Sequence, residues 1–273
     1  MKNVAGYDMR KLFLGSWGTL GIITEIILRL LYLPEERRTL MLKFSDIEDV
    51  SRIVAHISNS FLRPESMELI EARATQSLGP DDSFKLESDE LLLLVGVTGS
   101  SEVVERHIAD IRTMAEANNA LAVSVLSGTE EDMAWASQRR IQLYSTPGMI
   151  KGKAVTPINK IGDSFQEIQK VATRHGLQVS ITGHAGSGIL HPKFLLREHS
   201  DYDSTVLAAI AELVQSTDKL GGFFLVESGP QEIRQAYDLT SQRSDYELMR
   251  RLKQSFDPNN IFNPGKMIRT SHP

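Results

Sequence analysis

The sequence predicts an α+β fold, because two apolar patterns alternate along most of the chain. Short runs of aliphatic and β-branched residues are typical of strands, and longer stretches repeat their apolar residues at helical spacing. In order, these segments give β-α-β-β-α-β between residues 39 and 125 and, less regularly, the same order again up to residue 227. This order is the split βαβ pattern of ferredoxin-like units. We therefore expect two such units, followed by a helical C-terminal segment.

The first unit begins with an apolar strand at residues 39–44. Ser45 to Glu48 then matches a capping box, in which a hydroxyl and a carboxylate satisfy the free N–H groups of a helix start. Apolar residues follow at helical spacing, at Ile47, Val50, Val54 and Ile57. The other expected elements are strands at 66–71, 90–97 and 121–125 and a helix at 102–118 with Val104, Ile108, Ile111 and Ala115 on one face.

The second unit follows a helix expected at residues 130–143. A second capping box at Ser164 to Glu167 predicts the start of a helix that ends at Gly176, where glycine favours a helix C-terminus. The other expected elements are strands near Ala154, at 178–182, near Ile189 and at 222–227, a helix at 205–217, and tail helices at 231–237 and 245–256.

Composition excludes several classes of protein. A chain of 273 residues with 41% hydrophobic residues can bury one large core or two smaller ones. The net charge of −5 argues against nucleic-acid binding, which needs Lys and Arg to neutralise phosphates. The chain has no cysteine, so it forms no disulfide and supplies no thiolate to zinc or an Fe–S cluster. No signal peptide is visible, and we expect a cytoplasmic location.

The most apolar stretch runs from Leu20 to Leu33 and is interrupted by Glu25 and Arg29. It is shorter than the run of about 20 apolar residues that a membrane-spanning helix needs. We therefore expect no transmembrane segment here. A strand followed by a segment docked on a core is the better interpretation.

Three motifs occur in order along the chain: residues 2–8 with 11–24, residues 184–191, and residues 256–266. The first includes Gly15-Ser16-Trp17-Gly18-Thr19-Leu20-Gly21, and the last includes Asn263-Pro264-Gly265. Together they resemble the end of the FAD domain, the metal loop and the C-terminal signature of the glycolate oxidase and D-lactate dehydrogenase family. The resemblance implies the C-terminal part of an FAD-linked 2-hydroxyacid oxidoreductase that lacks most of its flavin-binding half.

The resemblance also implies an organisation in three parts. Residues 1–36 would be a remnant of the FAD-binding domain, residues 37–230 a ferredoxin-like cap that binds substrate, and residues 231–273 helices and a tail that return to the FAD site. The cofactor-side positions would be Asn3, Gly6, Tyr7, Asp8, Gly15, Gly18, Gly21, Ile22 and Asn263. Glycines let a backbone approach a dinucleotide closely, although such a cluster also suits ordinary turns. We expect that FAD is not held by this chain alone. Trp17 replaces the family's usual Glu.

His184 and His191 are spaced like two ligands on a strand-turn-strand loop, because the small residues between them let the chain double back. With one carboxylate they would suit Zn²⁺, Mn²⁺ or Fe²⁺. The resemblance supplies that carboxylate as Glu227. The alternative is a pair of partly exposed loop histidines with no ligand. Ser187 and Ile189 replace the Asp and Asn of the family's loop, which removes polar support for the ligands.

The resemblance also implies substrate-binding cations. Arg139 follows Trp135 on a helix that matches the family and would clamp a substrate carboxylate, since guanidinium binds carboxylate through two parallel hydrogen bonds. The alternative for Arg139 is a surface salt bridge. Lys151 would be a second substrate-binding cation, and Lys153 stands where relatives often have Asp.

The catalytic base of the family is a His that directly follows the ligand Glu, and here that position is Ser228. A hydroxyl is a poor base near neutral pH, so no catalytic residue is evident for the oxidation of a 2-hydroxy acid by hydride transfer to flavin. One hypothesis is an FAD-dependent oxidoreductase, or a subunit of one, acting on a substrate such as glycolate or D-lactate. The other hypotheses are a non-catalytic, cap-like subunit of a glycolate oxidase-type complex and a remnant without function.

Partners are expected under the first two hypotheses. Without upstream strands, residues 20–33 would expose a sheet edge, which favours pairing with another chain. We expect a flavoprotein subunit, an Fe–S subunit or a second copy of this chain, and attachment to a membrane only through such a partner.

Overall fold

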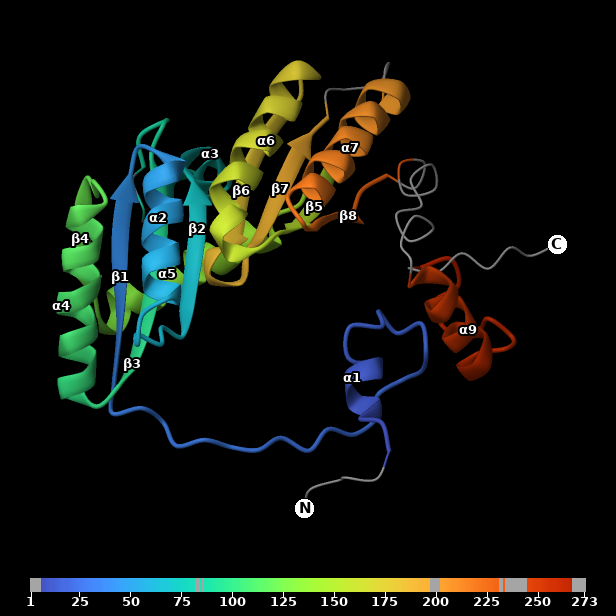
Figure 1. Ribbon diagram of the computed structural model, residues 1–273, viewed down its shortest axis with the longest axis horizontal. Coiled ribbons are helices and arrows are strands. Elements are labelled where there is room, and N and C mark those ends of the chain that lie inside the picture. The colour runs from blue at the N-terminus through green and yellow to red at the C-terminus, as the bar shows by residue number, and fades with distance from the viewer. Residues whose placement is uncertain are drawn as a thin grey trace. The chain divides into compact units, whose positions relative to one another are not determined.

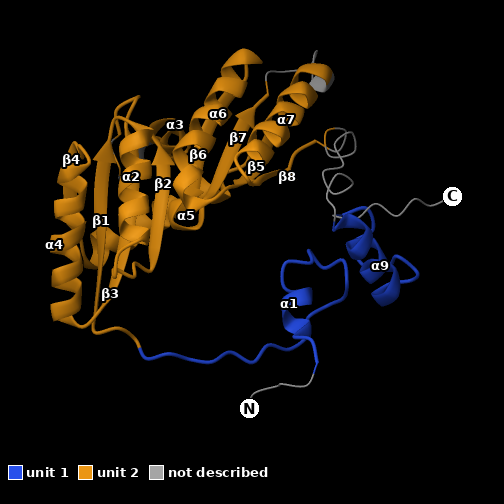
Figure 2. Ribbon diagram, viewed as in Figure 1, with its two compact units in different colours: residues 1–32, 235–273 blue, residues 33–234 orange. Residues whose placement is uncertain are grey.

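The computed structural model describes residues 6–81, 84, 86–196, 202–230, 233 and 245–266. The chain divides into two compact units, residues 1–32 with 235–273 and residues 33–234 (Figure 2). We call them the small unit and the sheet unit. The small unit contains helices α1 (Met9–Phe13) and α9 (Tyr246–Phe256). The functional assignment of the predicted domains remains a prediction.

The sheet unit is built on one sheet of eight strands in the order β4-β1-β3-β2-β6-β7-β5-β8 (Figure 1). Neighbouring strands run antiparallel throughout, and the β2–β6 pair joins the two halves. The strands are β1 (Glu36–Phe44), β2 (Ser66–Glu71), β3 (Leu91–Gly99), β4 (Ala122–Leu126), β5 (Met149–Val155), β6 (Gln178–His184), β7 (Ile189–Leu195) and β8 (Phe223–Ser228).

Helices cover the two faces of this sheet unequally (Figure 1). Four long helices lie on one face: α2 (Ile47–Ser58), α4 (Ser101–Ala117), α6 (Ile161–Arg174) and α7 (Tyr202–Lys219). Helix α5 (Gly128–Leu143) lies on the other, which we call the α5 face. Short helical turns complete the unit: α3 (Ala72–Thr75), η1 (Gln76–Asp81), η2 (Ile158–Lys160) and η3 (Ala185–Ser187).

The predicted mixture of helices and antiparallel strands is confirmed, with the element order β1-α2-β2-β3-α4-β4 and then β5-α6-β6-β7-α7-β8. Two helix starts differ from the prediction. Asp46, not Ser45, caps α2, because its carboxylate accepts the backbone N–H of Glu48 at 2.9 Å. The second capping box is wrong: α6 already begins at Ile161, directly after the turn η2, and Ser164 is buried inside the helix. Helix α6 ends before Gly176, whose φ of 64° suits glycine, as predicted.

The main core lies between the sheet and the four long helices. Alternate residues of β1 and β3 point into it, and α2 meets them with one apolar stripe. Each such side chain stabilises the fold by about 1.5–3 kcal/mol when it is fully buried. The fully buried members include Leu40, Leu42, Leu93, Val95, Val50, Ile53, Val54 and Ile57.

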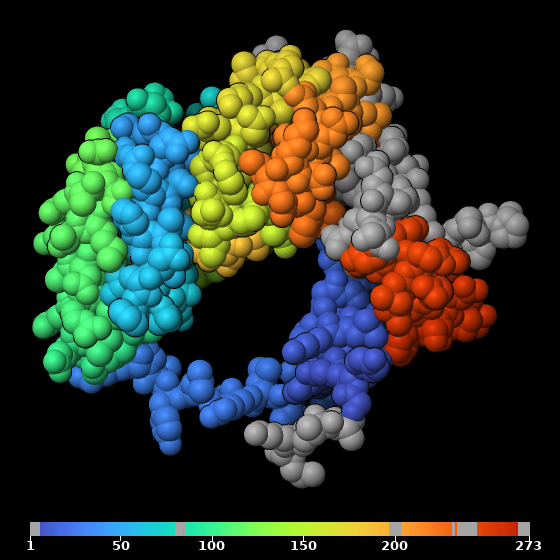
Figure 3. Space-filling model, viewed as in Figure 1, coloured from blue at the N-terminus to red at the C-terminus, as the bar shows by residue number. Residues whose placement is uncertain are grey.

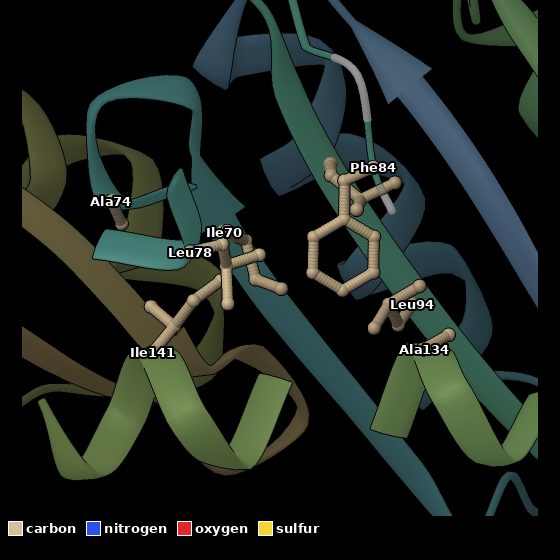
Figure 4. Close-up of a cluster of buried hydrophobic side chains, with 8 residues drawn as sticks. Ile70, Ala74, Leu78, Phe84, Leu94, Ala134 and Ile141 are labelled. Carbon is tan, nitrogen blue, oxygen red and sulfur yellow. The ribbon is translucent and has the colours of Figure 1, made fainter. Parts of the chain in front are cut away.

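A second apolar cluster lies on the α5 face of the first half of the sheet. Figure 4 shows Ile70 and Leu94 of the strands facing Ala134 and Ile141 of α5, with Phe84 beside them. Leu92, Ala74 and Leu78 complete the buried set, and Trp135 packs at its edge. This cluster fixes α5 over the first half of the sheet.

The structure corrects the prediction for residues 20–33. Residues 21–34 form neither strand nor helix, and their large apolar side chains are exposed, with Ile27 at 91% and Tyr32 at 102%. Figure 3 shows this stretch, coloured blue, as a narrow chain of atoms. The physical reason is that no neighbouring strand in the described part of the chain takes up its backbone N–H and C=O groups. The helix predicted at 231–237 lies outside the described residues except for Ile233, whereas the one at 245–256 is confirmed as α9.

Candidate functional site

The second half of the sheet presents polar side chains on the α5 face. Side chains alternate between the two faces of a strand, so Lys151 and Lys153 of β5 and His191 and Lys193 of β7 point to the same side. Lys151 lies opposite Lys193, and the same register places Lys153 opposite His191. We call the set the polar face, and it consists of Lys151, Lys153, His184, His191, Lys193 and Glu227.

An irregularity in the β5–β8 pair places Glu227 in this set. Lys151 lies opposite Ser228 and Gly152 lies opposite Val226, so Glu227 is the extra residue of a β-bulge. A bulge changes the direction of a side chain and is common beside active sites. Glu227 thereby reaches His191, with 3.3 Å between its Oε2 atom and the imidazole Nδ1.

His184 is held by residues that the sequence analysis missed. Its Nδ1 atom lies 2.7 Å and 2.9 Å from the two carboxylate oxygens of Glu68, on β2. Gln138 of α5 donates to the same carboxylate at 3.0 Å, and the Gln142 amide lies 3.1 Å from His184 Nε2. The hydrogen bond to Glu68 raises the pKa of His184, while burial and the charge of Lys153 oppose the rise. The one sequence signal for Glu68 was a carboxylate between the apolar residues Met67 and Leu69 of a strand.

The predicted metal ligands come together only in part. The rings of His184 and His191 meet edge to face with their centroids 5.3 Å apart, and His191 adjoins Glu227. Among the described residues, however, no group of three His, Asp or Glu side chains is placed to hold one metal ion. Both ring nitrogens of His184 already have protein partners, Glu68 and Gln142. The residues as arranged therefore do not fit a metal ion, and the metal prediction is not supported.

Positive charge dominates the polar face. Burial raises the pKa of Glu227, but His191, Lys151 and Lys153 outweigh burial and lower it. Lys193 is 5% exposed, and burial, followed by the charge of Lys151, lowers its pKa to about 8. The Lys193 ammonium donates to the carbonyls of Ile141, Gln142 and Tyr144, and so binds the C-terminal end of α5. Cations stabilise that end of a helix.

The predicted substrate-binding cations differ in their surroundings. Lys151 donates to the Gln142 carbonyl at 3.1 Å and is partly buried. Arg139 is exposed on α5, and in the described part of the chain it forms no ion pair, so the surface salt bridge is not observed there. Trp135, four residues before it, donates from its indole N–H to the Thr39 hydroxyl at 2.8 Å and anchors the helix.

The small unit brings the predicted flavin-side positions of both chain ends together. The Asn263 amide donates to the Trp17 carbonyl at 2.6 Å, and a Cβ on Gly18 would lie 3.0 Å from the same amide. Gly6 and Gly15 have positive φ angles of 104° and 82°, and a Cβ on either would meet no atom within 4 Å. This open, left-handed backbone is compatible with a close approach of a cofactor.

The other flavin-side positions are placed individually. Tyr7 and Ile22 are exposed, at 95% and 77%, and Gly21 lies against the ring of Phe13. Asp8 caps α1 by accepting the backbone N–H of Arg10 at 3.2 Å, which is a structural use of that carboxylate. Asn3 lies outside the described residues.

A buried ion pair, absent from the sequence analysis, joins the two segments of the small unit. Lys253 of α9 is 1% exposed and binds Asp257. Its ammonium also donates to the Thr19 and Phe262 carbonyls, each at 2.8 Å. Thr19 adjoins Gly18 and Phe262 adjoins Asn263, so this pair fixes the two flavin-side segments against each other.

Comparison with known proteins identifies the family. The family model "FAD linked oxidases, C-terminal domain" matches residues 33–267. The chain therefore belongs to this family. It is 32% identical to the glycolate oxidase subunit GlcD of Bacillus subtilis over 98% of its own length and 58% of that protein. It is 23% identical to the mitochondrial D-lactate dehydrogenase [cytochrome] 1 of Saccharomyces cerevisiae, over 98% of its own length and 48% of that protein.

Solved structures show the same fold. Alkyldihydroxyacetonephosphate synthase aligns with a TM-score of 0.59 at 19% identity, over 97% of this chain and 51% of that one. p-Cresol methylhydroxylase aligns with a TM-score of 0.61 at 14% identity, over 88% and 54%. The chain thus spans about half the length of the proteins it matches. No helix in the described residues is long and apolar enough to cross a membrane.

Proposed function

We propose that this chain is the substrate-binding part of an FAD-linked oxidoreductase that oxidises a small 2-hydroxy acid. The observation that carries the proposal is the polar face: three lysines gather on the second half of the sheet, in a chain that belongs to the FAD-linked oxidases. A 2-hydroxy acid is an anion, and a positively charged, partly buried surface attracts and orients anions. The names of the glycolate oxidase and D-lactate dehydrogenase relatives support this substrate class.

Arg139 and Lys151 bind the carboxylate of the substrate in this proposal. Arg139 has no ion-pair partner in the described residues, so its guanidinium is available for two parallel hydrogen bonds to a carboxylate. Lys151 uses one N–H on the Gln142 carbonyl and retains two further donors. These interactions would fix the acid and leave its hydroxyl-bearing carbon free to react.

The substrate hydroxyl proton needs an acceptor, and His184 is the best placed group. Its Nδ1 atom is bound by Glu68 and its Nε2 atom lies 3.1 Å from the Gln142 amide, so Nε2 would accept the proton after that amide turns away. Ser228 lies opposite Lys151 and is exposed, but a hydroxyl cannot serve as a base near neutral pH. Holding the imidazole through a carboxylate increases its basicity and fixes its tautomer.

Bound FAD would supply the acceptor for the hydride that leaves the substrate. Gly15, Gly18 and Asn263 of the small unit would hold part of it, because the backbone at Gly15 is open and Lys253 holds the segments of Gly18 and Asn263 together. The rest of the flavin site would come from sequence that corresponds to the part of the relatives this chain does not span. A longer form of this protein or a flavoprotein subunit would supply that sequence, and the subunit name of one relative supports a complex.

The test is to purify the tagged chain from its native host together with whatever it binds. Bound FAD is measured by absorbance, and dye reduction is measured with glycolate and D-lactate. Arg139→Ala and Lys151→Ala should each raise KM by about tenfold or more, as expected when one charged hydrogen bond is lost. Arg112→Ala, at an exposed position of α4, is the matched control and should leave KM unchanged. A colourless, inactive preparation would contradict the proposal.

A second candidate function is a non-catalytic subunit of such a complex, and Ser228 is the observation that favours it. The two candidates differ at His184. If His184→Gln lowers kcat at least about a hundredfold, as loss of a general base does, the chain is catalytic. If the variant complex keeps its flavin and its full turnover, the non-catalytic function is correct.

A further inference from the structure

Lys153 lies on the polar face beside residues that were predicted to bind a metal ion. The register of β5 and β7 places it directly opposite His191, and residues opposite each other in an antiparallel pair have Cβ atoms about 4.5–5.5 Å apart. On its other side, Lys153 lies opposite Leu225, two residues before Glu227. Its charge influences both Glu227 and His184.

Among the described residues, the Lys153 ammonium is compensated only by the charge of Glu227, which also adjoins His191. It is partly buried, and in the described part of the chain it forms no ion pair or hydrogen bond. The other charges nearby are already used: Lys193 binds the end of α5, Glu68 binds His184, and Glu227 adjoins His191. A partly buried charge without a partner is costly unless a ligand of opposite charge compensates it.

A metal ion at this position would meet two obstacles. His184 would have to give up Glu68 or Gln142 before it could donate to the ion. A divalent cation bound by His191 would also lie beside the ammonium of Lys153, which the register places opposite His191. Neighbouring like charges repel strongly at the low effective dielectric constant of a partly buried site. An ion at this position would therefore have to displace a contact that His184 already makes.

We propose that Lys153 takes the place of a metal ion in this site, and that its ammonium, together with Lys151, binds a small carboxylate anion without any metal. The positive charge that a divalent cation would contribute comes from the side chain. The nature of the anion rests on the proposed function, whereas the absence of metal binding does not.

The first arm of the experiment measures metal binding without substrate or flavin. Zn²⁺ is titrated by calorimetry into the untagged full chain, into Lys153→Asp and into the control Lys170→Asp, at an exposed position of α6. Wild type and the control should take up no stoichiometric Zn²⁺. Lys153→Asp should bind one equivalent at least about a hundredfold more tightly, because a repelling charge becomes an attracting one. Adding His191→Ala should remove this gain.

The second arm measures anion binding, with oxalate as the probe and EDTA present throughout. Wild type should bind oxalate, Lys153→Met should weaken binding by about tenfold or more, and Lys170→Met should not. The proposal is overturned if wild type binds one equivalent of Zn²⁺ that His191→Ala removes, if EDTA abolishes oxalate binding, or if Lys153→Met leaves that binding unchanged. If the proposed function is wrong, the purified complex contains no flavin and shows no turnover, while the Zn²⁺ and oxalate titrations still give the expected results.

Discussion

The two halves of the sheet share one strand topology but use their α5 faces differently. In the first half, β2 and β3 present Ile70, Leu92 and Leu94 on this face, and α5 buries them together with Phe84. In the second half, β5 to β8 present lysines, histidines and a carboxylate, and the end of α5 meets them through its carbonyl groups. The backbone arrangement is therefore common to both halves, while the side chains on one face separate a structural half from a binding half.

The difference between the two α5 faces indicates which part of a repeated fold can bind a ligand. A face that is covered by an apolar cluster stabilises the domain but offers no chemistry. A face that carries uncompensated charge loses stability and gains an affinity for ligands. Glu68 and Gln138 lie at the boundary, because both belong to the covered half and yet hold His184 of the other half.

The largest expected effect concerns the covered half. Leu94→Ala removes a fully buried side chain from the cluster between β3 and α5. We expect a loss of about 3–4 kcal/mol in the free energy of unfolding, measured by urea denaturation, because a cavity remains. Leu248→Ala is the control, since Leu248 is 54% exposed, and it should change stability by less than about 0.5 kcal/mol. Equal losses in the two variants would mean that the cluster does not fix α5.

In the second half of the sheet, we expect polar contacts between Lys193 and the C-terminal end of α5 to stabilise the fold. Lys193→Met leaves the Ile141 and Tyr144 carbonyls without their ammonium donor, whereas the Gln142 carbonyl keeps Lys151. We expect a loss of about 2–3 kcal/mol in the free energy of unfolding, since buried acceptors without partners are costly. Lys170→Met is the matched control. An unchanged stability would show that α5 is held by its apolar cluster alone.

The smallest expected effect on stability concerns the His184–Glu68 pair, which joins the two halves of the sheet and depends on pH. The folded pKa of His184 is raised above its unfolded value, so the pair with Glu68 stabilises the fold fully below that unfolded value, about pH 6.5. This stabilisation is lost as pH rises through the folded pKa. Because His184 is 36% exposed, we expect a contribution of only about 0.5 kcal/mol. The difference in unfolding free energy between wild type and Glu68→Gln should thus be larger at about pH 5.5 than at about pH 8.5. A difference that grows with pH would contradict this sign.

The fold was largely predictable because apolar periodicity reports which side chains are buried. Val50, Val54 and Ile57 repeat at helical spacing, and all are fully buried in α2. Helix starts were less predictable, because Ser45 and Asp46 are both good caps and only the backbone decides between them. Residues 20–33 were misread because a strand needs a neighbour, and apolar sequence alone does not say whether one is present.

The site was predictable only where residues are close along the chain or match the family's motifs. His184 and His191 lie next to each other, but the partner of His184, Glu68, is 116 residues away and joins it only through the β2–β6 pair. The position of Glu227 depends on a bulge, which leaves no clear signal in the sequence. The place of Lys153 opposite His191 depends on strand register, which again only the fold supplies.

The central claim is that small anions bind the α5 face of the second half of the sheet and leave the first half untouched. Methyl NMR during an oxalate titration tests it most directly, with Ile189 and Val155 reporting on the polar face and Ile70 and Leu94 on the covered cluster. The account predicts that Ile189 and Val155 shift in a saturable manner while Ile70 and Leu94 do not move. Shifts of Ile70 and Leu94, or no shift of Ile189 and Val155 at saturating oxalate, would contradict it.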